Sequence, residues 1–278
     1  MSKKKKSLDV ILEDLGLKTG QVRAILYNQK KSKPKILKRF ISDKDLSFAV
    51  VSDTHLCSRY EKLDELHTFY HICKKQGVKI VFHAGDLLDG NGCMYRGNLN
   101  EIHTYGADRQ IKYVVENYPK IKGITTYYTG GNHCLSFFND NGVDVGLKIA
   151  EKREDIIYLG QYEGNIEINK VRFRVIHPAR GVCYAISYAM QKYAEQIASG
   201  NKPDVLFAGH FHTSVYFWYR NMHIFQCGTF QGQTPFLARK GLNPAIGGWI
   251  CKLKLGNVDR VVALESCWIP FFDEKKGK

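Results

Sequence analysis

The sequence predicts a layered α/β domain preceded by a basic N-terminal extension. Three short apolar runs, at residues 48–51, 78–82 and 124–129, alternate with segments of helical periodicity, which is typical of this fold class. The 278-residue chain is 44% hydrophobic and 24% charged, an ordinary composition for a globular protein. At this length, one large domain with a small appendage is expected.

The predicted elements follow a regular order. Three segments have the periodicity of helices: residues 60–76, 107–118 and about 182–199. Residues 165–176 predict a hairpin with Asn169 and Lys170 at its turn. Five further runs predict short strands: residues 205–208, 215–219, 223–227, 249–255 and 261–267. The main domain is therefore expected at residues 45–270.

Positive charge is concentrated at the N-terminus. Residues 1–39 contain twelve basic and three acidic residues, a net +9 of the +14 carried by the whole chain. A basic extension of this kind concentrates polyanions such as nucleic acid. Its apolar residues between positions 7 and 29 fit two short helices, which are either a reduced helix-turn-helix or a helical pair docked on the main domain. The lysine-rich residues 28–44 predict a linker.

Cysteine usage and hydropathy exclude several classes of protein. The eight cysteines form no C-x-x-C pair, which argues against a structural zinc site and a disulfide scaffold and favours a reducing compartment. No apolar run approaches the roughly 18 residues that cross a bilayer. The start of the chain is too charged, and its apolar run too short, for a signal peptide. We therefore expect a cytoplasmic protein without a membrane span.

Polar residues of metal-binding types follow five predicted strands. They are Asp53 and His55, Asp86, Asn132 and His133, His177, and finally His210 and His212. In open α/β folds, ligands bind beyond the carboxyl ends of strands, so these groups are expected to converge. Each group alone has an ordinary explanation as a turn or a strand end. Their joint occurrence favours one shared site.

The chemistry of these donors indicates the kind of ion. Carboxylate, amide and imidazole groups together suit borderline divalent ions such as manganese, iron, zinc or nickel, and suit a calcium site poorly. Two such ions about 3.5–4 Å apart can share a hydroxide and neutralise phosphate oxygens during an in-line displacement. Water bound to the ions ionises near neutral pH, which supplies a nucleophile without a protein base.

The order of these motifs resembles that of the calcineurin-like metallophosphoesterase superfamily. D-x-H begins at residue 53, G-D-x-x-D at 85, G-N-H at 131, a single histidine stands at 177, and G-H-x-H begins at 209. The resemblance implies a four-layer fold, a β-sandwich flanked by helices, with two divalent metal ions, manganese in first place. It implies a first ion bound by Asp53, His55 and His212, a second bound by Asn132, His177 and His210, and a bridging Asp86.

The same resemblance implies a proton donor beside the metals. His133 is the histidine of G-N-H that is not a ligand, and it would protonate the leaving oxygen. Asp89 would orient His133 and raise its pKa. Cys134 stands where the superfamily commonly has an acid, which leaves the surroundings of His133 open. Arg180, shortly after His177, is a candidate for binding a substrate phosphate.

Two features favour nucleic acid as the substrate. One is the basic extension, because neutralisation of phosphates drives binding to nucleic acid. The other is the segment at residues 227–234, followed by Asn243 and Pro244, which is similar to the C-terminal end of the exonuclease subunit of archaeal family D DNA polymerases. Gly90, Asn91 and Cys134 differ from the protein-phosphatase pattern.

These features predict a phosphodiesterase that hydrolyses nucleic acid, DNA before RNA, and acts as a nuclease. The nucleophile would be a metal-bridging hydroxide, with His133 as proton donor. Two alternatives stay open. One is a small-molecule phosphatase or cyclic-nucleotide phosphodiesterase; the other is a nucleic-acid-binding subunit of a replication or repair complex, without turnover. The sequence leaves the oligomeric state open.

Overall fold

The structure is a computed structural model that describes residues 36–39, 45–91, 98–179, 181, 183–256 and 261–272. The predicted helix-turn-helix falls within residues 1–35, which lie outside the described residues. Arg180 lies outside them as well. In the described part, no helix is long and apolar enough to cross a membrane.

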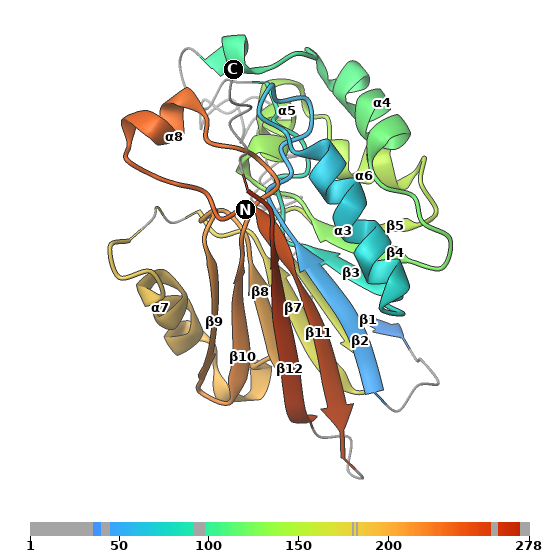
Figure 1. Ribbon diagram of the computed structural model, residues 1–278, viewed down its shortest axis with the longest axis vertical. Helices are drawn as coiled ribbons and strands as arrows, with labels where there is room; N and C mark the ends of the chain where they lie inside the picture. The colour runs from blue at the N-terminus through green and yellow to red at the C-terminus, as the bar shows by residue number, and fades with distance from the viewer. Residues whose placement is uncertain are drawn as a thin grey trace, which may run out of the picture. The chain divides into compact units, whose positions relative to one another are not determined.

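Two sheets form the centre of the domain (Figure 1). The first sheet contains, in spatial order, β1 (Ile36–Arg39), β6 (Glu163–Ile168), β7 (Val171–Ile176), β8 (Val205–Ala208), β10 (Met222–Cys227) and β9 (Ser214–Tyr219). The second sheet contains β12 (Val261–Pro270), β11 (Gly247–Leu255), β2 (Asp45–Val51), β3 (Ile80–His83), β4 (Thr125–Thr129) and β5 (Ile156–Gly160).

The central strands of each sheet are parallel. Strands β2, β3, β4 and β5 are parallel neighbours in the second sheet. Strands β7, β8 and β10 are parallel neighbours in the first sheet. Parallel strands end at the same edge of a sheet, so the polar residues that follow β2, β3 and β4 are brought together, as are those that follow β7 and β8.

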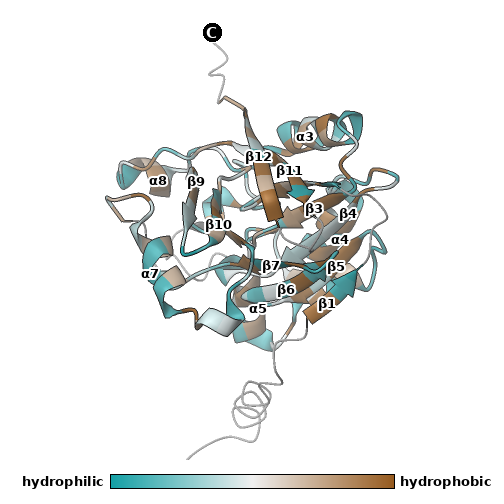
Figure 2. Ribbon diagram, turned by 90° about the horizontal axis from the view of Figure 1, so that it is seen from below, coloured by the Kyte–Doolittle hydropathy of each residue, from teal (hydrophilic) through white to brown (hydrophobic). Residues whose placement is uncertain are grey.

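Helices pack on the outer faces of the sheets or, like α8 (Pro235–Arg239), lie at their end (Figure 1). They are α3 (Leu63–Lys75), α4 (Ala107–Asn117), α5 (Asn132–Asn141), α6 (Val145–Ala150), α7 (Tyr188–Gln196) and α8, with short 3-10 turns at Asn98–Glu101 and Ser199–Asn201. Helix α3 buries Leu66, Phe69, Tyr70 and Cys73, a spacing that places them on one face. Figure 2 shows the mixture of hydrophobic and hydrophilic residues along this helix.

The alternation along β2 shows how the layers form. Phe48 and Val50 face the first sheet, whereas Ala49 and Val51 face helices α3 to α6. Both faces of β2 are therefore buried, which explains its continuous apolar run. Helix α7 packs on the opposite face of the first sheet through residues such as Met190. The result is the expected four-layer arrangement: helices, sheet, sheet, helix.

Aromatic rings fill the space between the two sheets. Phe48 lies 5.8, 5.4 and 5.7 Å from the ring centroids of Phe82, Phe173 and Phe207, each at a steep angle. Phe82 stacks on Phe173 at 5.0 Å. Edge-to-face and offset contacts at these distances add to the free energy gained by burial.

Most of the predicted elements of the main domain are present. The predicted hairpin is confirmed, and Asn169 and Lys170 occupy its turn with φ of 49° and 65°. The helix expected at residues 182–199 is shorter, because it begins only at Tyr188 and ends at Gln196. Residues 36–39, expected within a linker, form β1 instead, since they pair with β6. Strand β5 and helices α5, α6 and α8 were not predicted.

Candidate metal centre

Every described residue predicted to bind metal lies at one edge of the sheets. Asp53 and His55 follow β2, Asp86 follows β3, and Asn132 and His133 begin α5 directly after β4. His177 follows β7, and His210 and His212 follow β8. These side chains form two clusters, which we call the first cluster (Asp53, His55 and His212) and the second cluster (Asp86, Asn132, His177 and His210).

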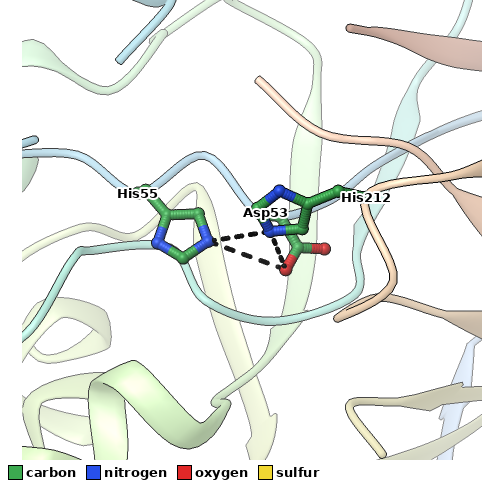
Figure 3. Close-up of side chains that lie close together, drawn as sticks. All are labelled: Asp53, His55 and His212. Carbon is green, nitrogen blue, oxygen red and sulfur yellow. Dashed lines mark hydrogen bonds and ion pairs between the residues drawn. The ribbon is translucent and has the colours of Figure 1, made fainter. Parts of the chain in front are cut away.

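The first cluster gathers two imidazoles around one carboxylate oxygen (Figure 3). Nε2 of His212 lies 3.3 Å from Oδ1 of Asp53, and Nε2 of His55 lies 3.8 Å from the same oxygen. The two Nε2 atoms are 3.2 Å apart. The carboxylate of Asp53 is itself held by the Ser52 hydroxyl, 2.5 Å away, and by the backbone N–H of His210.

The second cluster gathers two imidazoles around two oxygen atoms. Nε2 of His177 lies 3.0 Å from Oδ2 of Asp86 and 3.0 Å from Oδ1 of Asn132. Nδ1 of His210 lies 2.9 Å from the same Asn132 oxygen. The other oxygen of Asp86 accepts a hydrogen bond from the backbone N–H of His133 at 2.9 Å. These contacts of Asp86 lie in the second cluster and at the start of α5, and its bridging role stays a prediction.

The backbone at these positions is unusual. Asp53, His55, Asp86, His210 and His212 all have positive φ, between 43° and 77°. Residues other than glycine rarely adopt this region, and such strain gathers at functional sites. Close packing adds to the constraint, because a Cβ at Gly131 would lie 2.2 Å from Oδ1 of Asp86. The glycine of G-N-H is therefore required by space.

Outer hydrogen bonds fix which nitrogen of each ring faces the clusters. Nδ1 of His177 lies 2.8 Å from the carbonyl oxygen of Ala84, and a carbonyl only accepts, so Nδ1 carries the hydrogen. Nδ1 of His55 donates in the same way to Oδ1 of Asp89 at 2.9 Å. In both rings Nε2 is left to face the cluster, as in histidine ligands oriented by a carboxylate or a carbonyl.

The charged groups of the clusters shift one another's pKa values. Burial alone would raise the pKa of Asp53, but His212 and His55 hold it well below its usual value. Burial would lower the pKa of His55, yet hydrogen bonds to Asp53 and Asp89 raise it to about 10. Burial would also lower the pKa of His177, but the negative charge of Asp86 and its hydrogen bond raise it to about 9. The buried acids therefore retain a positive charge beside them.

These residues fit a pair of divalent cations. In its described contacts, Nε2 of His177 faces two oxygen acceptors, one from Asp86 and one from Asn132. Without a metal, a proton on Nε2 is shared with these oxygens. A cation at the same place would bind the nitrogen and both oxygens. Nδ1 of His212 is buried and has no hydrogen-bond partner among the described residues. Mixed imidazole, carboxylate and amide donors are those preferred by borderline divalent ions.

His133 and Asp89 lie beside the first cluster and contact each other. Nδ1 of His133 donates to the backbone carbonyl of Asp89 at 2.7 Å, whereas the Asp89 carboxylate lies 3.6 Å away. That carboxylate instead accepts from His55. Asp89 thus contacts both rings, His133 mainly through its carbonyl and His55 through its carboxylate, and its predicted role in orienting His133 stays a prediction. The His133 ring packs edge-on against His55, with centroids 4.5 Å apart.

Cys134 lies away from the site. Its side chain is 5% exposed and belongs to the apolar core beneath α5. Burial raises the pKa of its thiol to about 12. Because position 134 faces the core, the lack of an acid there leaves the contacts of His133 with Asp89 in place.

Two residues of the segment 227–234 support the site, although no role in it was predicted for them. Nε2 of Gln231 donates to Oδ1 of Asp89 at 3.3 Å and to the hydroxyl of Ser58 at 3.0 Å. The hydroxyl of Thr229 donates to the backbone carbonyl of Asp53 at 2.7 Å. Both lie in the 227–234 segment, whose similarity to a polymerase subunit was the available signal.

A pocket of about 650 Å³ opens onto both clusters. Its polar side includes His55, Asp86, Asn132, His133 and His210. Its lining also includes residues of α8 and of the loop that follows. Figure 1 shows α5 and α8 at the same end of the sheets. The volume lies within the range of about 300–1,000 Å³ that is typical of small-ligand pockets.

Comparison with known proteins gives several similarities. The chain is 25% identical over 259 residues to the DNA polymerase II small subunit of Methanocaldococcus jannaschii, a match that covers 76% of this chain. It spans only 42% of that relative.

Solved structures of similar fold include a novel archaeal phosphodiesterase, 16% identical with a TM-score of 0.47, covering 81% of this chain and 100% of the other. They also include vacuolar protein sorting 29 of Cryptosporidium parvum, 12% identical with a TM-score of 0.45, covering 82% and 99%. A family model, the calcineurin-like phosphoesterase superfamily domain, matches residues 46–239, which is more than half of the chain. The chain therefore belongs to the calcineurin-like phosphoesterase superfamily.

Proposed function

We propose that the protein is a dinuclear-metal-dependent phosphodiesterase that cleaves nucleic acid, DNA before RNA. Membership in the superfamily implies metal-dependent phosphoesterase activity. The observation that carries the proposal is the pair of adjacent clusters at one pocket, each combining imidazole nitrogens with buried oxygen ligands.

The proposed ligands divide between the two clusters. Asp53, His55 and His212 would hold one ion, and Asn132, His177 and His210 the other, with Asp86 between them. Bound divalent ions, which we expect to be manganese before iron, zinc or nickel, would neutralise phosphate oxygens and generate the nucleophile from water. The hydrogen bonds from His177 to Ala84 and from His55 to Asp89 orient these proposed ligands before substrate arrives.

His133 is proposed to give a proton to the leaving oxygen. Its Nδ1–H is committed to the carbonyl of Asp89, which fixes the orientation of the ring. Nε2 is then the nitrogen that can transfer a proton, and its ring lines the pocket. The edge-on contact with His55 keeps this ring next to the first cluster.

Two observations support nucleic acid as the substrate. The relative from M. jannaschii is a subunit of a DNA polymerase, and the chain resembles less than half of it. Residues 1–39 carry a net +9, which favours binding to a polyanion.

The seven described cysteines are all free, in accord with the reducing, cytoplasmic location that we propose.

The test compares cleavage with binding. The purified full chain, stripped of metal and reloaded with Mn²⁺, is incubated with 5′-labelled single-stranded and duplex DNA, with RNA, and with bis-p-nitrophenyl phosphate. We expect cleavage of DNA that needs the metal and is lost in Asp86→Asn and His133→Asn. The exposed Trp218, outside the pocket, provides a matched control, Trp218→Ala.

Two other outcomes have distinct meanings. Hydrolysis of the small ester with intact oligonucleotides would contradict the nuclease and favour a small-molecule phosphoesterase, which the modest volume of the pocket also suits. Binding of DNA without any hydrolysis by the metal-loaded chain would contradict catalysis and leave a nucleic-acid-binding subunit.

A further inference from the structure

Helix α8 directs apolar side chains into the pocket. Phe236 and Leu237 are partly buried and line the pocket together with Leu242 and Pro244. None of these four residues belongs to the three apolar core clusters of the described chain. Their apolar surface therefore lies at the pocket and outside these clusters. We call this set the apolar wall.

The apolar wall is held in place by local hydrogen bonds. The Thr234 hydroxyl caps the start of α8 by accepting from the N–H of Leu237 at 3.2 Å. The N–H of Leu242 returns to the carbonyl of Leu237 at 2.9 Å, and Gln233 donates to the carbonyl of Leu242 at 2.8 Å. A wall fixed in this way loses little conformational entropy when a ligand packs on it.

Charge is distributed unevenly around the pocket. Asp86, Asp89 and Glu101 line it on the side of the clusters. Lys240 is the only lysine or arginine among its described lining residues, and its Nζ lies 6.0 Å from the centre of the Phe236 ring. An aromatic ring and a cation therefore stand together among the residues that line the pocket.

We propose that the apolar wall binds the base of an unpaired nucleotide next to the scissile phosphate, with the base stacked on Phe236 and the neighbouring phosphate at Lys240. This inference rests on the proposed function, and it adds the substrate class, a single-stranded segment or end. An aromatic face combined with a cation is the arrangement that binds single strands without base specificity.

The size of the pocket favours an unpaired strand. About 650 Å³ accommodates a group of nucleotide size, not a duplex. Inside a duplex both faces of a base are covered by its neighbours, so the Phe236 ring can stack only on a base that has left the helix.

The first experiment measures kcat/KM on single-stranded oligonucleotides with either a normal or an abasic nucleotide beside the cleaved bond. We expect the wild type to prefer the normal strand, and Phe236→Ala to lose roughly 10- to 100-fold on that strand but little on the abasic one. Phe236→Trp should restore the preference, and Trp218→Ala should leave it unchanged. Equal rates on the two strands in the wild type would overturn the proposal.

A second readout does not depend on turnover. In a His133→Asn background loaded with Zn²⁺, a trinucleotide carrying 2-aminopurine should lose fluorescence on binding, because stacking quenches it. Phe236→Ala should abolish the quenching, and Lys240→Ala should weaken binding and reduce its salt slope by about one. Unchanged quenching in Phe236→Ala would contradict the proposal.

Failure of this inference differs from failure of the proposed function. If the wild type cleaves both strands equally, the phosphodiesterase stands and the apolar wall has no role in base binding. If the metal-loaded wild type cleaves no oligonucleotide at all, both proposals are contradicted.

Discussion

The edge of the sheets that holds the two clusters and the aromatic layer between the sheets come from neighbouring residues of the chain, yet their physical properties are opposite. Phe82 at the end of β3 is fully buried among other aromatic rings. Four residues later, Asp86 is just as buried but charged, with φ of 49°. The layer consists of apolar side chains in regular strands, whereas the edge consists of charged groups on a strained backbone.

This difference separates what holds the fold from what performs the chemistry. Burial of apolar surface in the layer contributes to stability. Buried charges and positive φ at the edge cost stability and persist because the surrounding structure holds them. Substitutions in the layer should therefore change the free energy of unfolding, and those at the edge should change turnover.

Asp86→Asn is expected to have the largest effect. Loss of the charged ligand should lower kcat/KM on a phosphodiester by at least about 10³-fold, since a bound cation contributes several kcal/mol to the transition state. The amide keeps an acceptor for the backbone N–H of His133, so the free energy of unfolding should change by less than about 2 kcal/mol. Steady-state kinetics and chemical denaturation measure the two quantities. Full activity in a folded variant would remove Asp86 from the site.

Phe48→Ala should show the opposite pattern. Phe48 contacts three other rings between the sheets and is fully buried, so its truncation should cost about 3–5 kcal/mol of unfolding free energy. Turnover per folded molecule, measured well below the melting temperature, should stay within a few-fold of wild type. Denaturant midpoints give the stability, and Phe48→Leu serves as the milder control. A large loss of turnover in folded Phe48→Ala would break the separation.

His83 should make the protein sensitive to acid. Burial lowers its pKa from 6.5 to about 3, and its Nδ1 accepts from the N–H of Gly85 at 3.3 Å, which requires a neutral ring. The unfolded chain binds this proton near pH 6.5 and the folded chain does not, so stability falls as pH drops below 6.5. Between pH 6.5 and 5 the loss should be about 2 kcal/mol.

His83→Gln provides the test of that sensitivity. Its amide can still donate to Thr54, which His83 contacts at 3.0 Å, but it does not titrate. Urea midpoints at pH 7 and pH 5 should fall less in the variant than in the wild type. Equal losses would assign the acid sensitivity to other groups.

The smallest effect is expected from Gln231→Ala. Gln231 supports Asp89, which in turn orients His55, so its loss should lower kcat/KM about 10-fold with little change in stability. Gln191→Ala, which removes a similar side-chain hydrogen bond on α7, is the matched control. A loss equal to that in Asp86→Asn would show that Gln231 does more than position other groups.

The residues of the two clusters could be singled out from the sequence because they share one signal. Each is a polar residue within a few positions of the end of an apolar run, as Asp53 is after Val51 and His210 after Ala208. Parallel strands bring such positions to one edge whatever their separation in the chain. The four layers were predictable from the resemblance, and the alternation along β2 supplies the physical reason.

Tertiary contacts decided what the sequence could not show. Residues 36–39 read as a lysine-rich linker, yet they form β1 because β6 offers a partner about 130 residues later. Whether the Asp89 carboxylate turns to His55 or His133 depends on distances of 2.9 and 3.6 Å, which spacing along the chain does not encode. Helix α8 had a local signal, Thr234 before Pro235, but its role in the pocket depends on the fold.

The most direct test of the account counts the metal ions bound. The metal-stripped full chain is titrated with Mn²⁺ or Zn²⁺, and the bound ions are counted by calorimetry and elemental analysis. We predict two ions per wild-type chain and one after either His212→Ala or His177→Ala, because these residues belong to different clusters. A wild-type chain that binds no ion, or variants that both retain two, would contradict the dinuclear centre.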